Sequence, residues 1–209
     1  MSVDPQLFET WARGWALTRG AAPPVRDREA WRIEVGQPDQ IRRFVYADLC
    51  DDVARRGAEI VEPFVFLKVC AEPEAVRPLF SAVWDVRQTG VVMALDEAMP
   101  PVEDVEDDLA VKLWSEGPVR FMQLLDATGG EAARGRAVRV EDRVIYDRIA
   151  VAPEHRRRGL GGRIMRTLQA EQGGWPLGVL VATDEGARLY ESLGWRRLSP
   201  YTTAVIPAA

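Results

Sequence analysis

The fold is decided by the stretch Val151-Ala152-Pro153-Glu154-His155-Arg156-Arg157-Arg158-Gly159-Leu160-Gly161-Gly162. An apolar strand ends at its start, Pro153 interrupts that strand, and the glycines open a helix. Glycines let a ligand approach the backbone, and the first N–H groups of a helix carry partial positive charge. The three arginines add full charges and paired hydrogen-bond donors for an anion. The stretch therefore predicts a phosphate or pyrophosphate site at a helix N-terminus.

The glycines of this stretch do not form either of two well-known nucleotide-binding loops. A dinucleotide motif of the form G-x-G-x-x-G starting at Gly159 needs glycine at position 164, where Ile164 stands. A nucleotide P-loop needs Gly-Lys-Ser or Gly-Lys-Thr, and neither tripeptide occurs in the sequence. A glycine-rich turn alone is a weak signal, so the identity of the ligand depends on the flanking segments.

The flanking segments alternate between strand-like and helix-like patterns. After residue 118 the expected strands are Val119–Leu125, Ala132–Val140, Arg143–Val151, Leu177–Ala182, Trp195–Leu198 and Tyr201–Ile206, and the expected helices are Gly161–Gln172 and Glu185–Leu193. Before it, a helix starts after Asp4 and stops at Gly20, strands are expected at Trp31–Val35, Arg43–Ala47, Pro63–Val69 and Thr89–Leu95, and helices at Leu49–Ile60, Glu74–Ser81 and Val105–Ser115. These elements predict an α/β (α+β) fold with a mixed, mostly antiparallel central sheet flanked by helices.

Two motifs in the C-terminal half are similar to the signature of the GNAT acetyltransferase superfamily. Arg156-x-x-Gly159-x-Gly161 follows a strand ending in Ile149-Ala150-Val151, as that superfamily's acetyl-CoA motif follows its fourth strand. The second motif is Ala187-Arg188-Leu189-Tyr190-Glu191-Ser192-Leu193-Gly194-Trp195, which resembles the family's Ala-x-x-Leu/Phe-Tyr-x-x-x-Gly-Phe element with tryptophan in place of phenylalanine. Both occur in the family's order, and the resemblance covers roughly residues 118–206. It implies a GNAT-like fold and acetyl-CoA as cosubstrate.

The resemblance also implies which residues hold acetyl-CoA. Main-chain N–H groups from Arg157 to Gly162 would bind the pyrophosphate, and the arginine side chains would screen its charge. The edge of the strand would pair with the pantetheine amides, and a main-chain N–H there would polarise the thioester carbonyl. The cofactor-binding residues expected on this basis are Ile149, Ala150, Val151, Arg156, Arg157, Arg158, Gly159, Leu160, Gly161, Gly162 and Asp184.

Two residues are candidates for the proton transfers of such a reaction. In the family, a tyrosine at the position of Tyr190 protonates the leaving thiolate, although Tyr190 is equally compatible with a half-buried packing role. Asp147 is a candidate general base, because strict alternation places it on the face of Ile145, Ile149 and Val151, where an apolar setting raises a carboxyl pKa. A structural carboxylate paired with Arg148 or with an arginine elsewhere is the alternative for Asp147.

Asp184 departs from the family pattern. Many members have asparagine at this position, at the start of the second helix, where its amide contacts the cofactor. Aspartate caps a helix equally well but cannot donate a hydrogen bond as an amide does. Helix capping is therefore the expected role of Asp184, and its contact with the cofactor is in question. His155 lies in the loop before the glycines and is expected to be exposed and without a catalytic role.

Composition narrows the remaining function classes. The 209 residues carry a net charge of −5, whereas a general nucleic-acid binder is more often basic. Neither a membrane-spanning apolar stretch nor a signal peptide is expected, so the default location is the cytoplasm. Cys50 and Cys70 are expected to be reduced, buried thiols. With a single histidine and no closely spaced Cys/His set, a metal site is not expected.

The sequence predicts two regions and leaves the acceptor open. Residues 96–209 are the expected acetyl-CoA-binding region, and residues 1–95 are either a degenerate copy of the same fold or a set of substrate-binding elements. The acidic run from Asp96 to Asp108 is most simply a solvated loop, although it could instead attract a cationic acceptor. The leading hypothesis is transfer of an acetyl group to a primary amine of a small molecule or peptide. The alternative is a non-catalytic acyl-CoA sensor or interaction protein. A homodimer is one option for its assembly.

Overall fold

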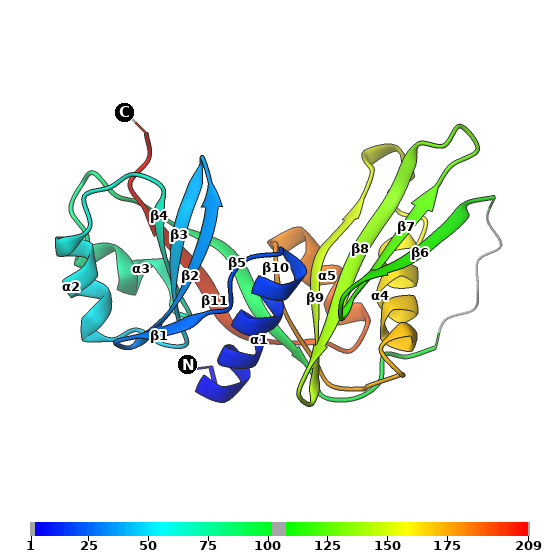
Figure 1. The fold of residues 1–209 in the computed structure, drawn as a ribbon, viewed down its shortest axis with the longest axis horizontal. Helices are drawn as coiled ribbons and strands as arrows, with labels where there is room; N and C mark the ends of the chain where they lie inside the picture. Colours follow the sequence, from blue (N-terminus) through cyan, green and yellow to red (C-terminus); the bar gives the residue numbers. More distant parts are fainter. Residues whose placement is uncertain (1–2, 102–107, 209) are drawn as a thin grey trace.

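One continuous sheet forms the middle of the molecule, as the computed structural model shows for residues 3–101 and 108–208 (Figure 1). Its strands are β1 (Val25–Asp27), β2 (Ala30–Gln37), β3 (Gln40–Tyr46), β4 (Val65–Val69), β5 (Asp85–Leu95), β6 (Ala110–Glu116), β7 (Val119–Leu125), β8 (Glu131–Val140), β9 (Arg143–Val151), β10 (Gly178–Ala182) and β11 (Arg196–Val205). The helices are α1 (Pro5–Thr18), α2 (Asp51–Glu59), α3 (Pro73–Val76), α4 (Leu160–Glu171) and α5 (Asp184–Ser192), with 3-10 turns η1 (Arg77–Leu79) and η2 (Pro153–His155).

The sheet is mixed and mostly antiparallel, which confirms the predicted fold class. The strand order is β1-β2-β3-β4-β11-β5-β10-β9-β8-β7-β6. Only the pairs β3–β4 and β9–β10 are parallel, and each of these pairs is connected through a helix, α2 or α4. A parallel pair needs such a crossover, whereas its antiparallel neighbours need only short turns.

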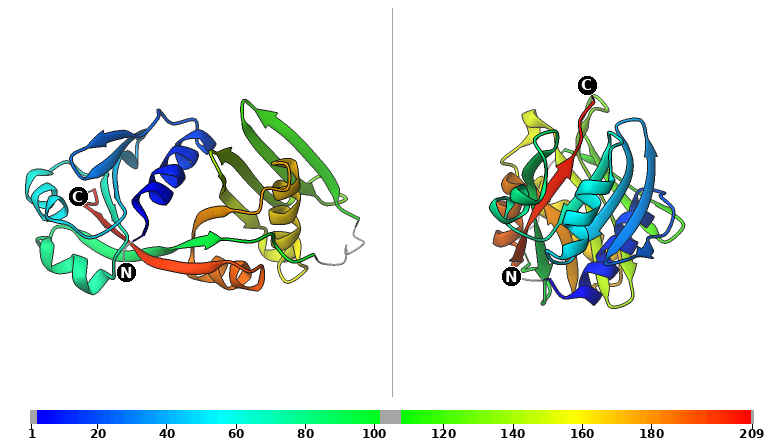
Figure 2. Two further views of the ribbon diagram at one scale, coloured as in Figure 1. Left: turned by 90° about the horizontal axis from the view of Figure 1, so that it is seen from below. Right: turned by 90° about the vertical axis from the view of Figure 1, so that its left-hand side faces the viewer.

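The two halves of the chain exchange their last strands. Each half runs through an antiparallel meander, a helix, a parallel strand, a second helix and a final strand. The final strand of the first half, β5, pairs with β10 of the second half, and the final strand of the second half, β11, pairs with β4 of the first. β5 and β11 also pair with each other, so they run side by side through the middle of the molecule (Figure 2).

Helices cover both faces of the sheet over its C-terminal half. Tyr146 and Leu180 belong to the apolar cluster that packs under α4 and α5, whereas their strand neighbours Ile145 and Val179 belong to the cluster under α1. Because successive residues of a strand point to opposite faces, α1 lies on the face opposite to α4 and α5. α2 and α3 cover a third cluster in the N-terminal half, which includes Leu67.

Helix α1 forms as its sequence predicts. The Asp4 carboxylate accepts hydrogen bonds from the main-chain N–H groups of Gln6 and Leu7, at 2.8 and 2.9 Å, and Pro5 occupies the first turn. The helix ends at Thr18, and Gly20 then adopts a positive φ of 62°. Its aromatic stripe, which includes Trp11 and Trp15, is buried against the sheet.

Two predictions about secondary structure are wrong. The expected helix Val105–Ser115 is replaced, over its described part, by the strand β6, which pairs along its whole length with β7. The expected strands Trp195–Leu198 and Tyr201–Ile206 are one strand, β11, because its irregular register beside β5 lets the pairing continue past Pro200. Residues 102–107, which contain most of the acidic run, lie outside the described residues. Within the described residues, no helix is long and apolar enough to cross a bilayer.

Candidate functional site

The site begins where two parallel strands separate. β9 and β10 are paired only at Val144–Gly178 and Ile145–Val179, and they diverge beyond that point. β9 is irregular there, since Arg148 has a φ of 52° and the register with β8 shifts between Arg134 and Arg136. The last residues of β9 therefore have no strand beside them on the β10 side.

The free edge of β9 presents main-chain groups to this gap. Ala152 donates its N–H to Ala132 in β8, at 2.9 Å. Because main-chain groups of successive strand residues alternate in direction, those of Ile149 and Val151 face away from β8 and toward the gap. An extended ligand with amide groups can pair with this edge as an added strand.

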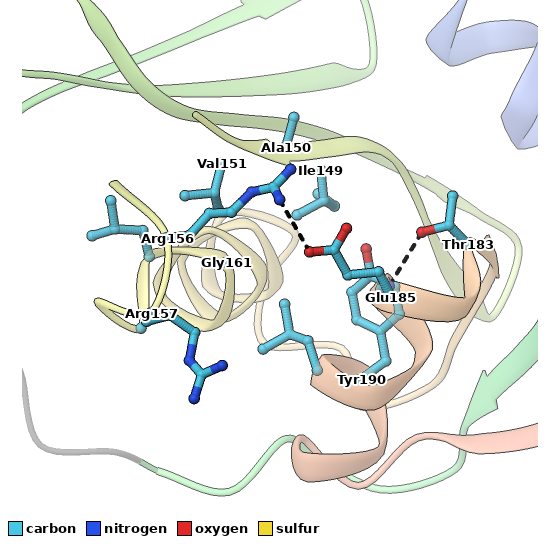
Figure 3. A pocket seen from close by; sticks show the side chains of 13 residues that line it. Ile149, Ala150, Val151, Arg156, Arg157, Gly161, Thr183, Glu185 and Tyr190 are labelled. Atoms are coloured by element: carbon cyan, nitrogen blue, oxygen red, sulfur yellow. Dashed lines mark hydrogen bonds and ion pairs between the residues drawn. The ribbon is translucent and has the colours of Figure 1, made fainter. Parts of the chain in front are cut away.

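A cavity of about 440 Å³ opens beside this edge, between β9, α4 and α5 (Figure 3). Its lining consists of Ile149, Ala150, Val151, Arg156, Arg157, Gly159, Leu160, Gly161, Thr183, Glu185, Gly186, Leu189 and Tyr190. Nine of these residues were expected from the sequence. Thr183, Glu185, Gly186 and Leu189 were not, although all four lie within or beside the second family motif. The structure thus brings most of the predicted cofactor residues together in one cavity.

The N-terminus of α4 faces this cavity with unused main-chain donors. Gly159 precedes the helix in a left-handed conformation, with φ 74°, and has no side chain that could cap it. The intrahelical bonds start with Arg163, which donates to Gly159 at 3.1 Å. The N–H groups of residues 160–162 therefore lack intrahelical acceptors and are suited to bind an anion.

The three arginines of the loop differ in direction. Arg156 reaches across the cavity to Glu185, with 3.3 Å between nitrogen and oxygen (Figure 3). Arg157 lines the cavity, with its backbone at a φ of 65°. Arg158 instead contacts the Nδ1 atom of His155 at 2.9 Å and does not line the cavity. The prediction that all three screen the pyrophosphate thus fits Arg156 and Arg157 better than Arg158.

His155 is less exposed than the sequence suggested. Its side chain is 14% exposed, and its Nε2 atom lies 3.5 Å from Asp126, in the turn between β7 and β8. The Asp126 carboxylate also accepts hydrogen bonds from the main-chain N–H groups of Thr128 and Gly130. His155 therefore ties the glycine-rich loop to a neighbouring turn and does not enter the cavity.

Gly161 and Gly162 at the start of α4 also allow close packing. A Cβ atom at Gly161 would lie 2.6 Å from Cδ2 of Leu189, so the absence of a side chain there lets α4 and α5 approach each other. A Cβ atom at Gly162 would lie 3.2 Å from the guanidinium of Arg166, and Gly162 does not line the cavity. Of the two glycines, only Gly161 borders the expected pyrophosphate position.

Tyr190 lines the cavity from α5. Its side chain is buried, and its ring centre lies 6.1 Å from that of Trp195. Burial raises the pKa of the Tyr190 phenol, so the group stays protonated at neutral pH. This placement suits a proton donor, and it suits a packing role equally.

Asp147 is held as a structural carboxylate, which contradicts the expected raised pKa. Arg19 and Arg136 each place an Nη2 atom 2.8 Å from its oxygens. Burial favours the neutral acid, but the hydrogen bonds and charges of Arg19 and Arg136 outweigh it and lower the pKa of Asp147. Asp147 also lies on the α1 side of the sheet, outside the cavity beside α4. These contacts fit the alternative role of Asp147, a structural carboxylate paired with arginines.

Asp184 does not cap α5, contrary to expectation. The cap is Thr183, whose Oγ1 atom accepts a hydrogen bond from the Gly186 N–H at 3.2 Å. Asp184 occupies the first helical position and accepts a long hydrogen bond of 3.4 Å from Gln88. It is exposed and does not line the cavity.

The chemistry of the site rests on main-chain donors, arginines and a phenol. In the part of the chain that the structure describes, no three His, Cys, Asp or Glu side chains are grouped so that they could hold a metal ion. Cys50 and Cys70 are free thiols, and neither lines the cavity. Burial raises the pKa of both thiols, so both are poor nucleophiles at neutral pH.

Comparisons with known proteins agree with this geometry. Residues 118–197 match a family model described as an acetyltransferase (GNAT) domain. Among solved structures, a GCN5-related N-acetyltransferase from Kribbella flavida aligns with a TM-score of 0.63 at 14% identity, over 96% of this chain and 95% of that one. A GCN5-related N-acetyltransferase-like protein from Streptococcus suis aligns with a TM-score of 0.58 at 11% identity, over 88% and 84%. A GCN5-related N-acetyltransferase from Sphaerobacter thermophilus gives 0.56 at 11% identity, over 87% and 78%. No curated protein matches the sequence.

Proposed function

Because the chain belongs to the GNAT acetyltransferase superfamily through residues 118–197, we propose that it transfers an acetyl group from acetyl-CoA to a primary amine. The observation that carries the proposal is the meeting, in one cavity, of a free strand edge and an uncapped helix N-terminus. A free strand edge suits the amide-containing pantetheine arm, and the helix N-terminus suits the pyrophosphate.

In this proposal the reaction is a direct attack in a ternary complex. The nitrogen lone pair of the amine forms a bond to the thioester carbonyl carbon, and the carbon–sulfur bond then breaks. A main-chain N–H at the edge of β9 stabilises the charge that develops on the carbonyl oxygen. Tyr190 donates a proton to the departing thiolate and is reprotonated from solvent. The ammonium proton of the acceptor passes to water.

The cysteines give no support to an acyl-enzyme route. Such a route needs a reactive thiolate in the acetyl-CoA cavity. Cys50 lies just before α2, and Cys70 lies directly after β4, both in the N-terminal half. The proposal therefore has no covalent intermediate.

A second candidate function is a non-catalytic acyl-CoA sensor. It is favoured by one observation, which is that the best sequence candidate for a general base, Asp147, is committed to two arginines. Calorimetry with acetyl-CoA, together with thiol release over a panel of primary amines, separates the two functions. Binding followed by thiol release supports the enzyme, whereas binding without release for any amine supports the sensor.

The N-terminal region is proposed to be a diverged copy of the same fold that has lost the cofactor site. In support, both halves share one order of elements and exchange their final strands. The loop between β3 and α2, which corresponds to the loop before α4, reads Ala47-Asp48-Leu49-Cys50 and has neither glycine nor arginine. A pyrophosphate has no comparable cradle there. Acetyl-CoA is accordingly expected to bind with a stoichiometry of one per chain.

A further inference from the structure

A second cavity, of about 210 Å³, lies on the α1 side of the sheet. Its lining includes Arg43, Lys68, Thr89, Tyr146, Asp147 and Tyr201. These residues come from strands of both halves of the chain. None of them lines the cavity beside α4 and α5.

The two cavities meet at the gap between β9 and β10. On β9, Asp147 borders the second cavity, and Ile149, two residues later, borders the first. On β10, Val181 borders the second cavity, and Thr183, directly after the end of β10, borders the first. The strands that separate at this point therefore have one cavity on each side.

The second cavity contains polar atoms that lack partners. The hydroxyl group of Tyr201 and the Nε atom of Arg43 are buried without a hydrogen bond within the described residues. Tyr201 is only 3% exposed. Buried polar groups are nearly always hydrogen-bonded, so two such atoms beside one cavity are suited to a polar ligand.

The cavity also has unneutralised positive charge. Lys68 is 7% exposed, and its Nζ atom donates to Thr203 at 2.7 Å, a neutral partner. Arg43 donates to Gln40, another neutral partner, at 2.6 Å. Across residues 3–101 and 108–208, neither Lys68 nor Arg43 forms an ion pair with a carboxylate.

Asp147 does not balance these charges. Among the described residues it is the only carboxylate that lines the cavity, and it is already shared by Arg19 and Arg136. Burial, and after it the charges of nearby arginines, lowers the pKa of Lys68 to about 7. An anion in the cavity would reverse that shift by giving the ammonium group a partner.

We propose that this second cavity binds an anionic group of the acceptor, a carboxylate or a phosphate, through Lys68, Arg43 and the Tyr201 hydroxyl. The acceptor is thus an amine that carries a compact anionic group, held so that its nitrogen faces the gap between β9 and β10. This inference rests on the proposed acetyl transfer for the identity of the amine, but the anion site itself rests on the cavity.

Asp96, the first residue of the acidic run, gives no support to a cationic acceptor. It is bound to Arg196 at 2.6 Å, and Arg143 lies 3.8 Å away. It directly follows the end of β5 that pairs with Gly178 and lines neither cavity. Most of the remaining run lies outside the described residues.

The first experiment measures thiol release from acetyl-CoA with four short primary amines, namely β-alanine, phosphoethanolamine, ethanolamine and 1,2-diaminoethane. We expect kcat/KM to be at least about tenfold higher for the carboxylate or the phosphate than for ethanolamine, the effect of a charged hydrogen bond. The anionic amine with the higher kcat/KM shows whether the site prefers a carboxylate or a phosphate. Equal use of all four amines, or a preference for the diamine, would overturn the inference.

Two variants test the residues directly. Lys68→Met should lower kcat/KM for the preferred anionic amine by about tenfold or more, with acetyl-CoA affinity and ethanolamine turnover nearly unchanged. Lys112→Met is the matched control, because Lys112 is the only other lysine and is exposed on β6. Tyr201→Phe, which deletes one unpartnered hydroxyl, should also lower kcat/KM for the anionic amine more than for ethanolamine, but by a smaller factor. If either variant lowers kcat/KM for ethanolamine as much as for the anionic amine, a role in anion binding is contradicted.

A final measurement does not depend on turnover. In the Lys112→Arg variant, Lys68 is the only lysine, so NMR of labelled lysine reports its titration alone. β-Alanine or inorganic phosphate should raise the pKa of Lys68 by at least about one unit, while ethanolamine should not. An upward shift without thiol release for any amine would refute acetyl transfer and keep the anion site. Absence of a shift with either anion would refute the anion site.

Discussion

Replacing Lys68 with methionine should raise the free energy of unfolding at low pH. At high pH the substitution should have no such effect. Methionine has a similar length and no charge, and it fits irregular apolar space. In the folded chain the pKa of Lys68 falls from 10.5 to about 7, mainly because the ammonium group is buried. At roughly 1.4 kcal/mol per pKa unit, this fall corresponds to about 5 kcal/mol against folding when the lysine is charged in both states.

The pH dependence follows from which state holds the proton. Between pH 7 and 10.5 the unfolded chain keeps Lys68 protonated, whereas the folded chain releases the proton. The free energy of unfolding therefore rises with pH across this window. Below pH 7 the folded chain bears the full cost of burying the charged lysine. Methionine removes the penalty but also removes the hydrogen bond to Thr203, which is worth about 1 kcal/mol. The net gain should be about 3–4 kcal/mol at pH 6, and it should vanish near pH 10.

Urea unfolding of the wild type and of Lys68→Met at pH 6, 7.5, 9 and 10 measures this difference. Lys112→Met serves as the control, because its exposed side chain should change the unfolding free energy by no more than about 0.5 kcal/mol at any pH. Comparing differences between variants cancels the titration of all other groups. A stability difference that does not vary with pH, or a loss of stability at pH 6, would refute the argument that Lys68 is a buried and unpaired cation.

Three further predictions concern the cavity beside α4 and the ion pairs behind it. Arg156→Gln should weaken acetyl-CoA binding by about tenfold in calorimetry, whereas Arg158→Gln, whose side chain points away to His155, should leave the affinity nearly unchanged; equal losses would place both in the same role. Tyr190→Phe should lower kcat by about a hundredfold with unchanged acetyl-CoA affinity, and an unchanged kcat would reduce Tyr190 to a packing residue. Asp147→Asn should lower the unfolding free energy by about 3 kcal/mol at pH 7, because two partly buried arginines lose their partner. Since its folded pKa is lowered, this loss should shrink as the pH falls below about 4, where Asp147 becomes protonated in the unfolded chain but stays ionised in the folded chain; a loss that is the same at pH 3 would contradict it.

The loop before α4 and the helix start beside the cavity were predictable because their signals are local. Gly159, Gly161 and the arginines lie within a few residues of one another, and glycines beside arginines at a helix start favour an anion close to the backbone. The expected helix around Val111 and Leu113 failed for the opposite reason. β6 lies at the edge of the sheet with most of its residues exposed, so its sequence has no apolar alternation, and pairing with β7 alone makes it a strand.

Asp147 shows a second limit of sequence reasoning. Alternation correctly placed it on the same face as Ile145 but wrongly on the face of Ile149 and Val151, because Arg148, with a φ of 52°, interrupts the alternation. The charges that meet it there come from Arg19, at the end of α1 and 128 residues earlier in the chain, and from Arg136 on β8. The sign of a pKa shift depends on such distant partners, which a single sequence does not reveal. Lys68 was missed for the same reason, since neither its burial nor its lack of a counter-ion can be read from the strand around it.

The exchange of final strands explains why the proposed acceptor site needs both halves of the chain. Lys68 lies on β4, Thr203 on β11 and Thr89 on β5, and their side chains form a hydrogen-bonded row across three adjacent strands. This row lies on the α1 side of the gap where β9 and β10 separate, while the loop proposed to bind acetyl-CoA lies on the other side. A fragment of residues 96–209 would keep the loop but lose both β4 and β5. In this proposal, the N-terminal half supplies residues that recognise the acceptor, and anion binding explains why the chain keeps a buried lysine that lowers stability.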